Sequence, residues 1–132
     1  MANLRCVVVT PEQTVLEAEA EFIALPLYDG EIGIAPGRSP LIGRLGYGEM
    51  RLMMGGTADR YYLDGGFVQI AQNVVSVLTN RAIAAGKVDA NAAQTQLEAA
   101  VKKSSATPEL EEIRNRQIAQ ARAQIRVAGR AK

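Results

Sequence analysis

The rhythm of apolar and polar positions changes near residue 86. Before it, short apolar runs recur between turn-forming residues, and within 49–52 charged and apolar side chains alternate as on the two faces of a strand. We expect strands at Leu4–Val9, Glu21–Pro26, Glu31–Ile34, Pro40–Leu45, Glu49–Met54, Arg60–Leu63, Phe67–Ala71 and Val74–Thr79. About eight to ten short strands in this length predict an antiparallel β-sandwich.

Three segments between the predicted strands carry residues suited to tight turns. They are Gly55-Gly56, Asp64-Gly65-Gly66 and Gln72-Asn73. Glycine and asparagine adopt the left-handed backbone of hairpin turns at little cost. We therefore expect a turn at each of the three.

Residues 88–132 are rich in alanine, glutamine and charged residues, which favours helix, and they are interrupted at 104–107. Asp89 can cap the first helix, and Thr107 the second, because Pro108 occupies the position whose amide needs no partner. The chain is thus expected to be an α+β protein with two units. An N-terminal β-sandwich occupies residues 1–86, and a C-terminal antiparallel two-helix hairpin occupies residues 87–132.

The apolar side of each predicted helix is narrow. At about 100° per residue, one set of side chains gathers on one side of each helix. These sets are Ala90, Ala93, Leu97, Ala100 and Val101 in the first helix, and Leu110, Ile113, Ala121, Ile125 and Ala128 in the second, with Gln117 and Gln124 among them. So few large apolar side chains cannot offset the ordering of both helices. We expect the hairpin to lean on the sandwich or on a partner, and a partner to set its position.

Charge separates the two units as well. Residues 1–85 hold 6 basic and 9 acidic side chains, a net charge of −3, whereas residues 86–132 hold 9 and 5, a net charge of +4. All charged side chains in the last twenty residues are basic. Without aromatic residues to stack on bases, this tail is not expected to bind nucleic acid, and an acidic protein surface suits its arginines better.

Most enzyme chemistry is disfavoured by what the chain contains. Histidine is absent and Cys6 is the single cysteine, set in an apolar run typical of a buried thiol. We expect neither catalytic nor metal-binding residues. No apolar run is long enough to span a membrane, and the N-terminus lacks the apolar core of a secretory signal, so we expect a cytosol-like compartment.

The densest cluster of glycine and proline lies at residues 29–41. Gly30 and Gly37 can adopt positive φ, while Pro36 and Pro40 fix φ and remove amide donors, so the backbone of this loop has a defined shape. A phosphate-binding loop is disfavoured because no Lys-Ser or Lys-Thr follows. A tight β-bend without further function remains an alternative.

Three stretches together resemble the epsilon-chain family of F-type ATP synthases, whose mitochondrial equivalent is called delta. They are residues 30–41, Gly-Glu-Ile-Gly-Ile-Ala-Pro-Gly-Arg-Ser-Pro-Leu, residues 62–70, Tyr-Leu-Asp-Gly-Gly-Phe-Val-Gln-Ile, and residues 73–79, Asn-Val-Val-Ser-Val-Leu-Thr. The resemblance covers essentially the whole chain. It implies a noncatalytic rotor subunit whose sandwich grips the gamma subunit and sits on the ring of membrane-embedded c subunits. Such a subunit couples proton-driven rotation to ATP synthesis.

The resemblance also assigns candidate contacts in the sandwich. In this family the loop at the Gly-Glu-Ile-Gly-Ile position faces the c ring, which makes Glu31, Ile32, Gly33 and Arg38 candidate c-ring contacts. The family often has histidine where this chain has Arg38, so a pH-linked property of that position is not expected here.

For the tail, the resemblance implies a hairpin that extends along gamma into the alpha/beta catalytic head and inhibits ATP hydrolysis. The candidate head contacts are Arg116, Arg122, Arg126 and Arg130. Some members bind ATP through a motif of Ile or Leu, Asp, two variable residues and Arg-Ala. Here Ala92 replaces the motif arginine, so we expect no cofactor and little ATP binding. Asp89, Arg122 and Arg126 remain as residual ATP-site candidates.

Two classes of function stay open at this point. The first is the coupling and regulatory rotor subunit, peripheral on the cytoplasmic face of the cell inner membrane if the source is bacterial, and membrane-associated only through the complex. The second is a β-sandwich interaction module with a structural helical tail, outside any rotary machine. An enzyme is disfavoured because the residues do not assemble an acid, a base and a nucleophile.

Overall fold

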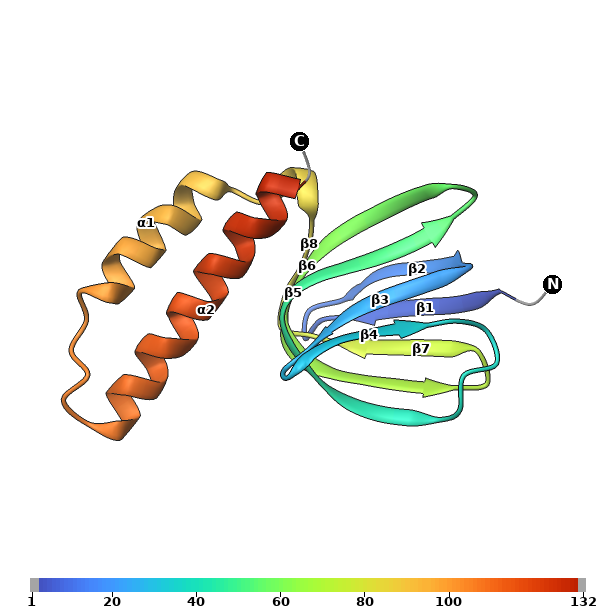
Figure 1. Ribbon diagram of the computed structural model, residues 1–132, viewed down its shortest axis with the longest axis horizontal. Coiled ribbons are helices and arrows are strands. Elements are labelled where there is room, and N and C mark those ends of the chain that lie inside the picture. Colours follow the sequence, from blue (N-terminus) through green and yellow to red (C-terminus); the bar gives the residue numbers. More distant parts are fainter. Residues whose placement is uncertain (1–2, 131–132) are drawn as a thin grey trace.

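Two long, bent strands organise the sheet. β5 (Leu41–Met54) and β6 (Thr57–Ala71) pair antiparallel along their whole length. In the computed structural model, which describes residues 3–130, both strands curve sharply near their middle (Figure 1). One half of each strand lies in each layer of the sandwich, so the sheet folds back on itself.

Six shorter strands complete the two layers. They are β1 (Leu4–Val9), β2 (Thr14–Ala20), β3 (Phe22–Leu27), β4 (Gly30–Ile34), β7 (Val74–Leu78) and β8 (Ala82–Ala84). The order is β2-β1-β7-β6-β5-β3-β4, with β8 paired to β6. The predicted α+β fold with eight to ten strands is confirmed, with one correction: β1 and β7 are parallel.

The predicted turn at Asp64-Gly65-Gly66 is wrong, because these residues lie inside β6. Gly65 and Gly66 have φ values of 72° and 107° and bend the strand without ending it. A Cβ on Gly66 would lie 1.9 Å from the carbonyl oxygen of Leu78, so this glycine permits a close approach of β7. Each of the two long strands was predicted as two, and β2 and β8 were not predicted.

The other two predicted turns are confirmed. Gly55-Gly56 joins β5 to β6 and Gln72-Asn73 joins β6 to β7, and all four residues have φ between 52° and 81°. A positive φ at both central positions is typical of the two-residue hairpin turn that matches strand twist.

The core fills the space between the two layers. It is built from inward-facing side chains of seven strands, and Cys6 is fully buried within it, as the sequence predicted. Its members are Leu4, Cys6, Val8, Ala20, Ile23, Leu25, Ile34, Leu45, Met50, Leu52, Leu63, Val68, Ile70, Val75 and Val77. All of them come from the β-sandwich, so this core does not depend on the helices.

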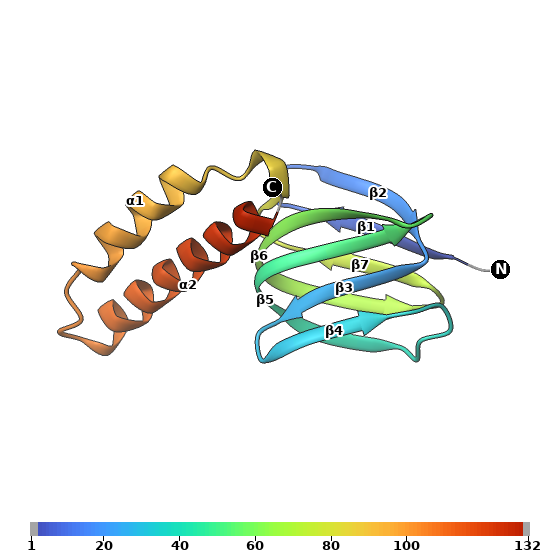
Figure 2. The ribbon, with the colours of Figure 1, turned by 45° about the horizontal axis from the view of Figure 1, so that its top comes forward.

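A short 3-10 turn, η1 (Ala85–Lys87), leads into α1 (Ala90–Val101) and α2 (Pro108–Arg130). Both predicted caps are confirmed: the Ala92 amide donates to Asp89 Oδ1 at 2.9 Å, and the Leu110 amide donates to Thr107 Oγ1 at 3.2 Å. The hairpin lies beside the bend of β5 and β6, with α2 nearer the sandwich (Figure 2).

The packing of α2 differs in part from the predicted stripe. Ala121, Gln124 and Ala128 are buried as expected, but Ala123 and Val127 are buried too and face the sandwich. The beginning of the helix extends past the sheet, which leaves Leu110 42% and Ile113 40% exposed. The expectation that the hairpin leans on the sandwich is met along the second half of α2.

Candidate functional site

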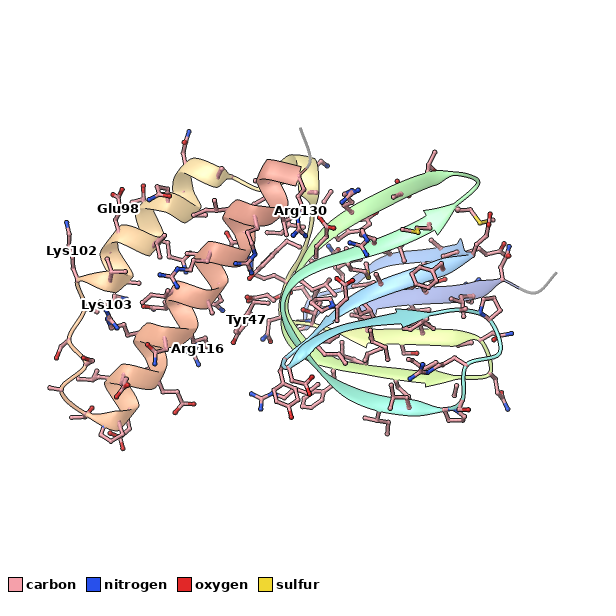
Figure 3. The ribbon with its side chains drawn as sticks, in the orientation of Figure 1. Tyr47, Glu98, Lys102, Lys103, Arg116 and Arg130 are labelled. Carbon is pink, nitrogen blue, oxygen red and sulfur yellow. The ribbon has the colours of Figure 1, made fainter. Side chains whose placement is uncertain are left out.

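A small apolar cluster seats α2 on the sandwich. Tyr62 of β6 and Ala85 of η1 pack against Ala123 and Val127 of α2, with Tyr47 of β5 beside them. Tyr47 lies between the sandwich and α2 (Figure 3). Alanine at the contact lets the helix approach closely but contributes little apolar area, so this seat is shallow.

A buried carboxylate adds a polar contact to this seat. Asp64 Oδ1 accepts the Tyr62 hydroxyl at 2.7 Å and Gln120 Nε2 of α2 at 3.0 Å. Burial raises the pKa of the Tyr62 phenol well above its ordinary value, and the hydrogen bond to Asp64 acts in the same direction. Tyr62 therefore stays a neutral donor to the Asp64 carboxylate.

A second buried carboxylate lies on the outer face of β5. The Glu49 side chain is 2% exposed, and its Oε1 atom lies 3.1 Å from Arg60 Nη1 and 3.6 Å from Arg51 Nη1. Arg130, at the end of α2, places Nη1 3.8 Å from the same oxygen. This ion-pair cluster joins the last turn of α2 to the sandwich, and Arg130 comes close to β5 and β6 (Figure 3).

The four candidate c-ring contacts lie in β4 and in the loop that follows it. Glu31 stands at the start of β4, where its carboxylate accepts from Arg51 at 3.2 Å. Ile32 is half-buried and packs on the core, and Gly33 lies under the ring of Phe22. Arg38 is exposed in the loop after β4.

The loop that carries Arg38 is held in a defined shape. The Gly37 amide donates to Asn73 Oδ1 at 2.7 Å, and Gly37 has a φ of 86° that favours glycine. The turn between β6 and β7 therefore fixes the loop between β4 and β5, and both lie at the end of the sandwich away from the hairpin (Figure 1).

The four candidate head-contact arginines lie along α2 with different neighbours. Arg122 and Arg126 line a groove of about 490 Å³ together with Arg44 of β5. Arg116 lines a neighbouring hollow, and Arg130 belongs to the Glu49 cluster. The lining of the 490 Å³ groove includes no acidic side chain, so like charges face one another across it.

The three residual ATP-site candidates have different surroundings. Asp89 is the N-cap of α1, with its Oδ1 atom accepting from the Ala92 amide, and Ala92 is exposed. Arg122 and Arg126 face the sandwich-side groove.

One outer sheet face carries large exposed apolar side chains. Ile42 is 75% exposed, Phe67 59% and Leu78 54%. Strand register places Phe67 opposite Leu78, and Leu78 opposite Val9. We call these four residues the outer apolar face. It borders a hollow of about 750 Å³.

Within residues 3–130, His, Cys, Asp and Glu side chains do not gather in threes in an arrangement that could hold a metal ion. Over the same range, none of the helices is long and apolar enough to cross a membrane.

Sequence reasoning missed Glu49, Asp64 and Tyr62 as parts of the helix seat. Glu49 and Arg130 are 81 positions apart, and their pairing depends on how α2 docks. The available signals were glutamines on the apolar side of α2 and a carboxylate within an apolar strand.

Sequence comparisons identify relatives of the chain. The sequence model of the ATP synthase delta/epsilon chain beta-sandwich domain matches residues 3–85. An ATP synthase epsilon chain of Rhodopirellula baltica is 48% identical over 126 residues, covering 96% of this chain and 98% of that protein. One of Desulfitobacterium hafniense strain Y51 is 41% identical over 96 residues, covering 73% of each chain.

Structure comparisons find the same fold in two large assemblies. A chain of the Euglena gracilis mitochondrial ATP synthase (OSCP/F1/c-ring) has a TM-score of 0.83 at 20% identity, covering 93% of this chain and 79% of that one. A chain of the Tetrahymena thermophila mitochondrial ATP synthase central stalk/c-ring has a TM-score of 0.75 at 13% identity, covering 96% and 97%.

Proposed function

The chain belongs to the ATP synthase delta/epsilon family, and on that premise we propose that it is a noncatalytic rotor subunit of the central stalk. In this role it couples proton translocation through the c ring to ATP synthesis in the catalytic head. The observation that carries the proposal is 48% identity to an ATP synthase epsilon chain over 98% of that protein's length. The alternative of an unrelated interaction module is not favoured.

The outer apolar face is the proposed contact with gamma. Contiguous exposed apolar side chains on a folded domain mark interaction sites, and Ile42, Phe67 and Leu78 are each more than half exposed. The face lies on rigid strands, which suits a subunit that must turn with its partner. Polar substitutions here should weaken attachment to gamma without unfolding the sandwich.

Contact with the c ring is proposed for Glu31 and Arg38, both exposed. Ile32 and Gly33 follow Glu31 along β4, where Ile32 packs on the core and Gly33 lies under the ring of Phe22. The hydrogen bond from Gly37 to Asn73 keeps the Arg38 loop in one shape, which favours a polar contact of fixed geometry.

The hairpin is proposed to inhibit ATP hydrolysis when it leaves the sandwich and reaches the alpha/beta head. Its seat is shallow, and Arg44, Arg122 and Arg126 face one another across a groove without an acidic lining residue. Release separates these like charges and frees them for an acidic partner. Arg116 and Arg130 extend the same basic helix.

We propose further that ATP is not a ligand of the folded hairpin, because Ala92 offers no cation beside Asp89. The proposed location is peripheral, on the cytoplasmic face of the inner membrane of a bacterium, with attachment through gamma and the c ring.

The test is ATP hydrolysis by the complex of alpha, beta and gamma from the same organism, titrated with the full chain or with residues 1–87. The sandwich core lies wholly outside the helices, so the shorter chain should fold. We expect both to bind and only the full chain to suppress turnover. Binding without suppression by either would remove inhibition from the proposal, and no binding would favour the interaction-module alternative.

A further inference from the structure

Three guanidinium groups converge on a single oxygen of Glu49. Arg60, Arg51 and Arg130 place Nη1 atoms 3.1, 3.6 and 3.8 Å from Oε1. Oε2 is buried and, within residues 3–130, has no hydrogen-bond partner. The three cations therefore share one acceptor, and a closer approach by one of them weakens the hold on the others.

Arg51 is divided between two carboxylates. Its Nη2 atom lies 3.2 Å from Oε1 of Glu31 on β4, while its Nη1 atom faces Glu49. The Glu31 side chain is 52% exposed and accessible to a partner, whereas the Glu49 side chain is 2% exposed. The ion pairs thus run from an exposed strand to the last residue of α2.

We propose that Glu31, Arg51, Glu49 and Arg130 form a relay that couples the surface at β4 to the docking of α2. When a basic group of a partner binds Glu31, Arg51 loses that carboxylate and turns fully to Glu49. The Glu49 carboxylate then holds Arg130 less tightly, and the last turns of α2 loosen from the sandwich. The relay rests on the proposed function only for the identity of the partner at Glu31.

The contact between Arg130 and Glu49 is weak enough to be broken. The longest of the three contacts to Glu49 is that of Arg130, whose side chain is 54% exposed. A partly exposed ion pair such as Arg130–Glu49 stabilises the docked helix only slightly, so competition from Arg51 for Glu49 is enough to weaken it. Arg60 of β6 lies 3.1 Å from Glu49 and belongs to the sandwich, so the buried carboxylate keeps a partner after α2 leaves.

Hydrogen exchange of the α2 amides in the isolated full chain tests the relay. Glu31→Gln, which does not touch α2, should speed exchange in its last two turns about threefold, a change within the range of exposed ion pairs. Arg51→Met should slow it by a similar factor, because Glu49 is then left to Arg60 and Arg130. Glu17→Gln removes an equally exposed ion-paired carboxylate on β2 and should leave α2 unchanged.

A general loss of stability would speed α2 exchange in both variants, whereas the relay predicts faster exchange in Glu31→Gln and slower exchange in Arg51→Met. Exchange of the β1 and β7 amides serves as an internal reference for the stability of the sandwich. In an Arg130→Gln background, Glu31→Gln should have no further effect on α2. The relay is overturned if Glu31→Gln leaves α2 exchange unchanged, if Arg51→Met speeds it, or if the Glu31→Gln effect persists without Arg130. None of these measurements uses the rotary complex, so they fail or succeed separately from the proposed function.

Discussion

Gln120 of α2 and Asp64 of β6 are joined by a 3.0 Å hydrogen bond, although 56 positions separate them in the sequence. The oxygen that accepts this bond also accepts the Tyr62 hydroxyl at 2.7 Å. The helix therefore docks on a carboxylate that the sandwich has already oriented. Removing Gln120 takes away a contact of the docked state and leaves the sandwich's own hydrogen bond in place.

Replacing Gln120 with Ala should loosen the hairpin while the sandwich stays folded. A hydrogen bond to a carboxylate contributes about 1.5–3 kcal/mol to stability. Part of this is recovered when water binds the carboxylate after the helix undocks. We expect at least about fivefold faster tryptic cleavage within α2, the equivalent of about 1 kcal/mol. Gln94→Ala, on the exposed side of α1, is the matched control. Equal cleavage of the two variants would remove this bond from the docking contact.

Gly33 is required because the ring of Phe22 leaves no room for a side chain. Its φ is not in the left-handed region, so backbone conformation is not the reason. A Cβ at this position would lie 2.6 Å from Cζ of Phe22. Gly33→Val should lower the free energy of unfolding by about 1–3 kcal/mol, as overpacking does, and should impair coupling in the complex. Gly43→Ala, whose nearest contacts would be 3.4 Å, is the control in urea unfolding.

Removing the Phe22 ring should restore part of the stability that Gly33→Val loses. In the Phe22→Ala background, Gly33→Val should cost less than it does in the parent chain, because the space above the strand is then open. A cost of the same size in both backgrounds would mean that Phe22 is not the restriction. A fully coupled Gly33→Val complex would count against a role for this strand at the c ring.

Charge reversal at two α2 arginines should relieve inhibition without loss of assembly. Arg122→Glu with Arg126→Glu keeps the helix polar and removes cations proposed to meet the catalytic head. We expect hydrolysis by the complex to rise about fivefold, equivalent to about 1 kcal/mol of lost contact, with unchanged binding to gamma. Arg5→Glu, on β1, is the control. Unchanged turnover would remove both arginines from the proposed contact.

ATP should bind the isolated chain weakly, with a dissociation constant above about 1 mM by calorimetry. Ala92→Arg restores the cation missing from the motif and should tighten binding at least about tenfold. Asn91→Arg adds the same charge one residue earlier, on a different side of α1. Tight binding by the unaltered chain, or equal gains from both variants, would contradict the inference drawn from Ala92.

The buried thiol of Cys6 should make the fold sensitive to alkali. Burial raises the pKa of Cys6 from its ordinary 9.0 to about 12. The unfolded chain therefore loses its proton first, so stability is complete below pH 9 and falls as pH rises toward 12, by up to about 1.4 kcal/mol per unit. Urea unfolding at pH 8 and pH 10 measures the loss, which Cys6→Ala should reduce. An equal loss in both proteins would assign it to other groups.

The sequence predicted those parts of the fold that depend on neighbouring residues. Both helix caps and the turns at Gly55-Gly56 and Gln72-Asn73 were confirmed, because capping and positive φ are local requirements. The glycines of β6 were misread for a related reason. Gly66 is required by the Leu78 carbonyl of a different strand, and the sequence of β6 alone carries no sign of that neighbour.

The helix seat could be predicted only in part. The narrow apolar side of each helix indicated that the hairpin must pack on another surface. Gln124, a polar residue on that apolar side, was a signal of a polar contact there. The partners of α2 are Asp64 and Glu49, whose roles depend on which side of bent strands they occupy and on where α2 ends. Spacing along a sequence does not fix the angle at which a helix meets a sheet.

The parallel pairing of β1 with β7 has a consequence for biosynthesis. Arg5 lies opposite Val74, so β1 receives its second neighbour only after some seventy further residues have been synthesised. Until then the β1–β2 hairpin carries an open edge that can pair with other nascent chains. Completion of the sandwich thus awaits β7, and the helices that follow emerge onto a sheet in which the open edge of β1 has just been paired.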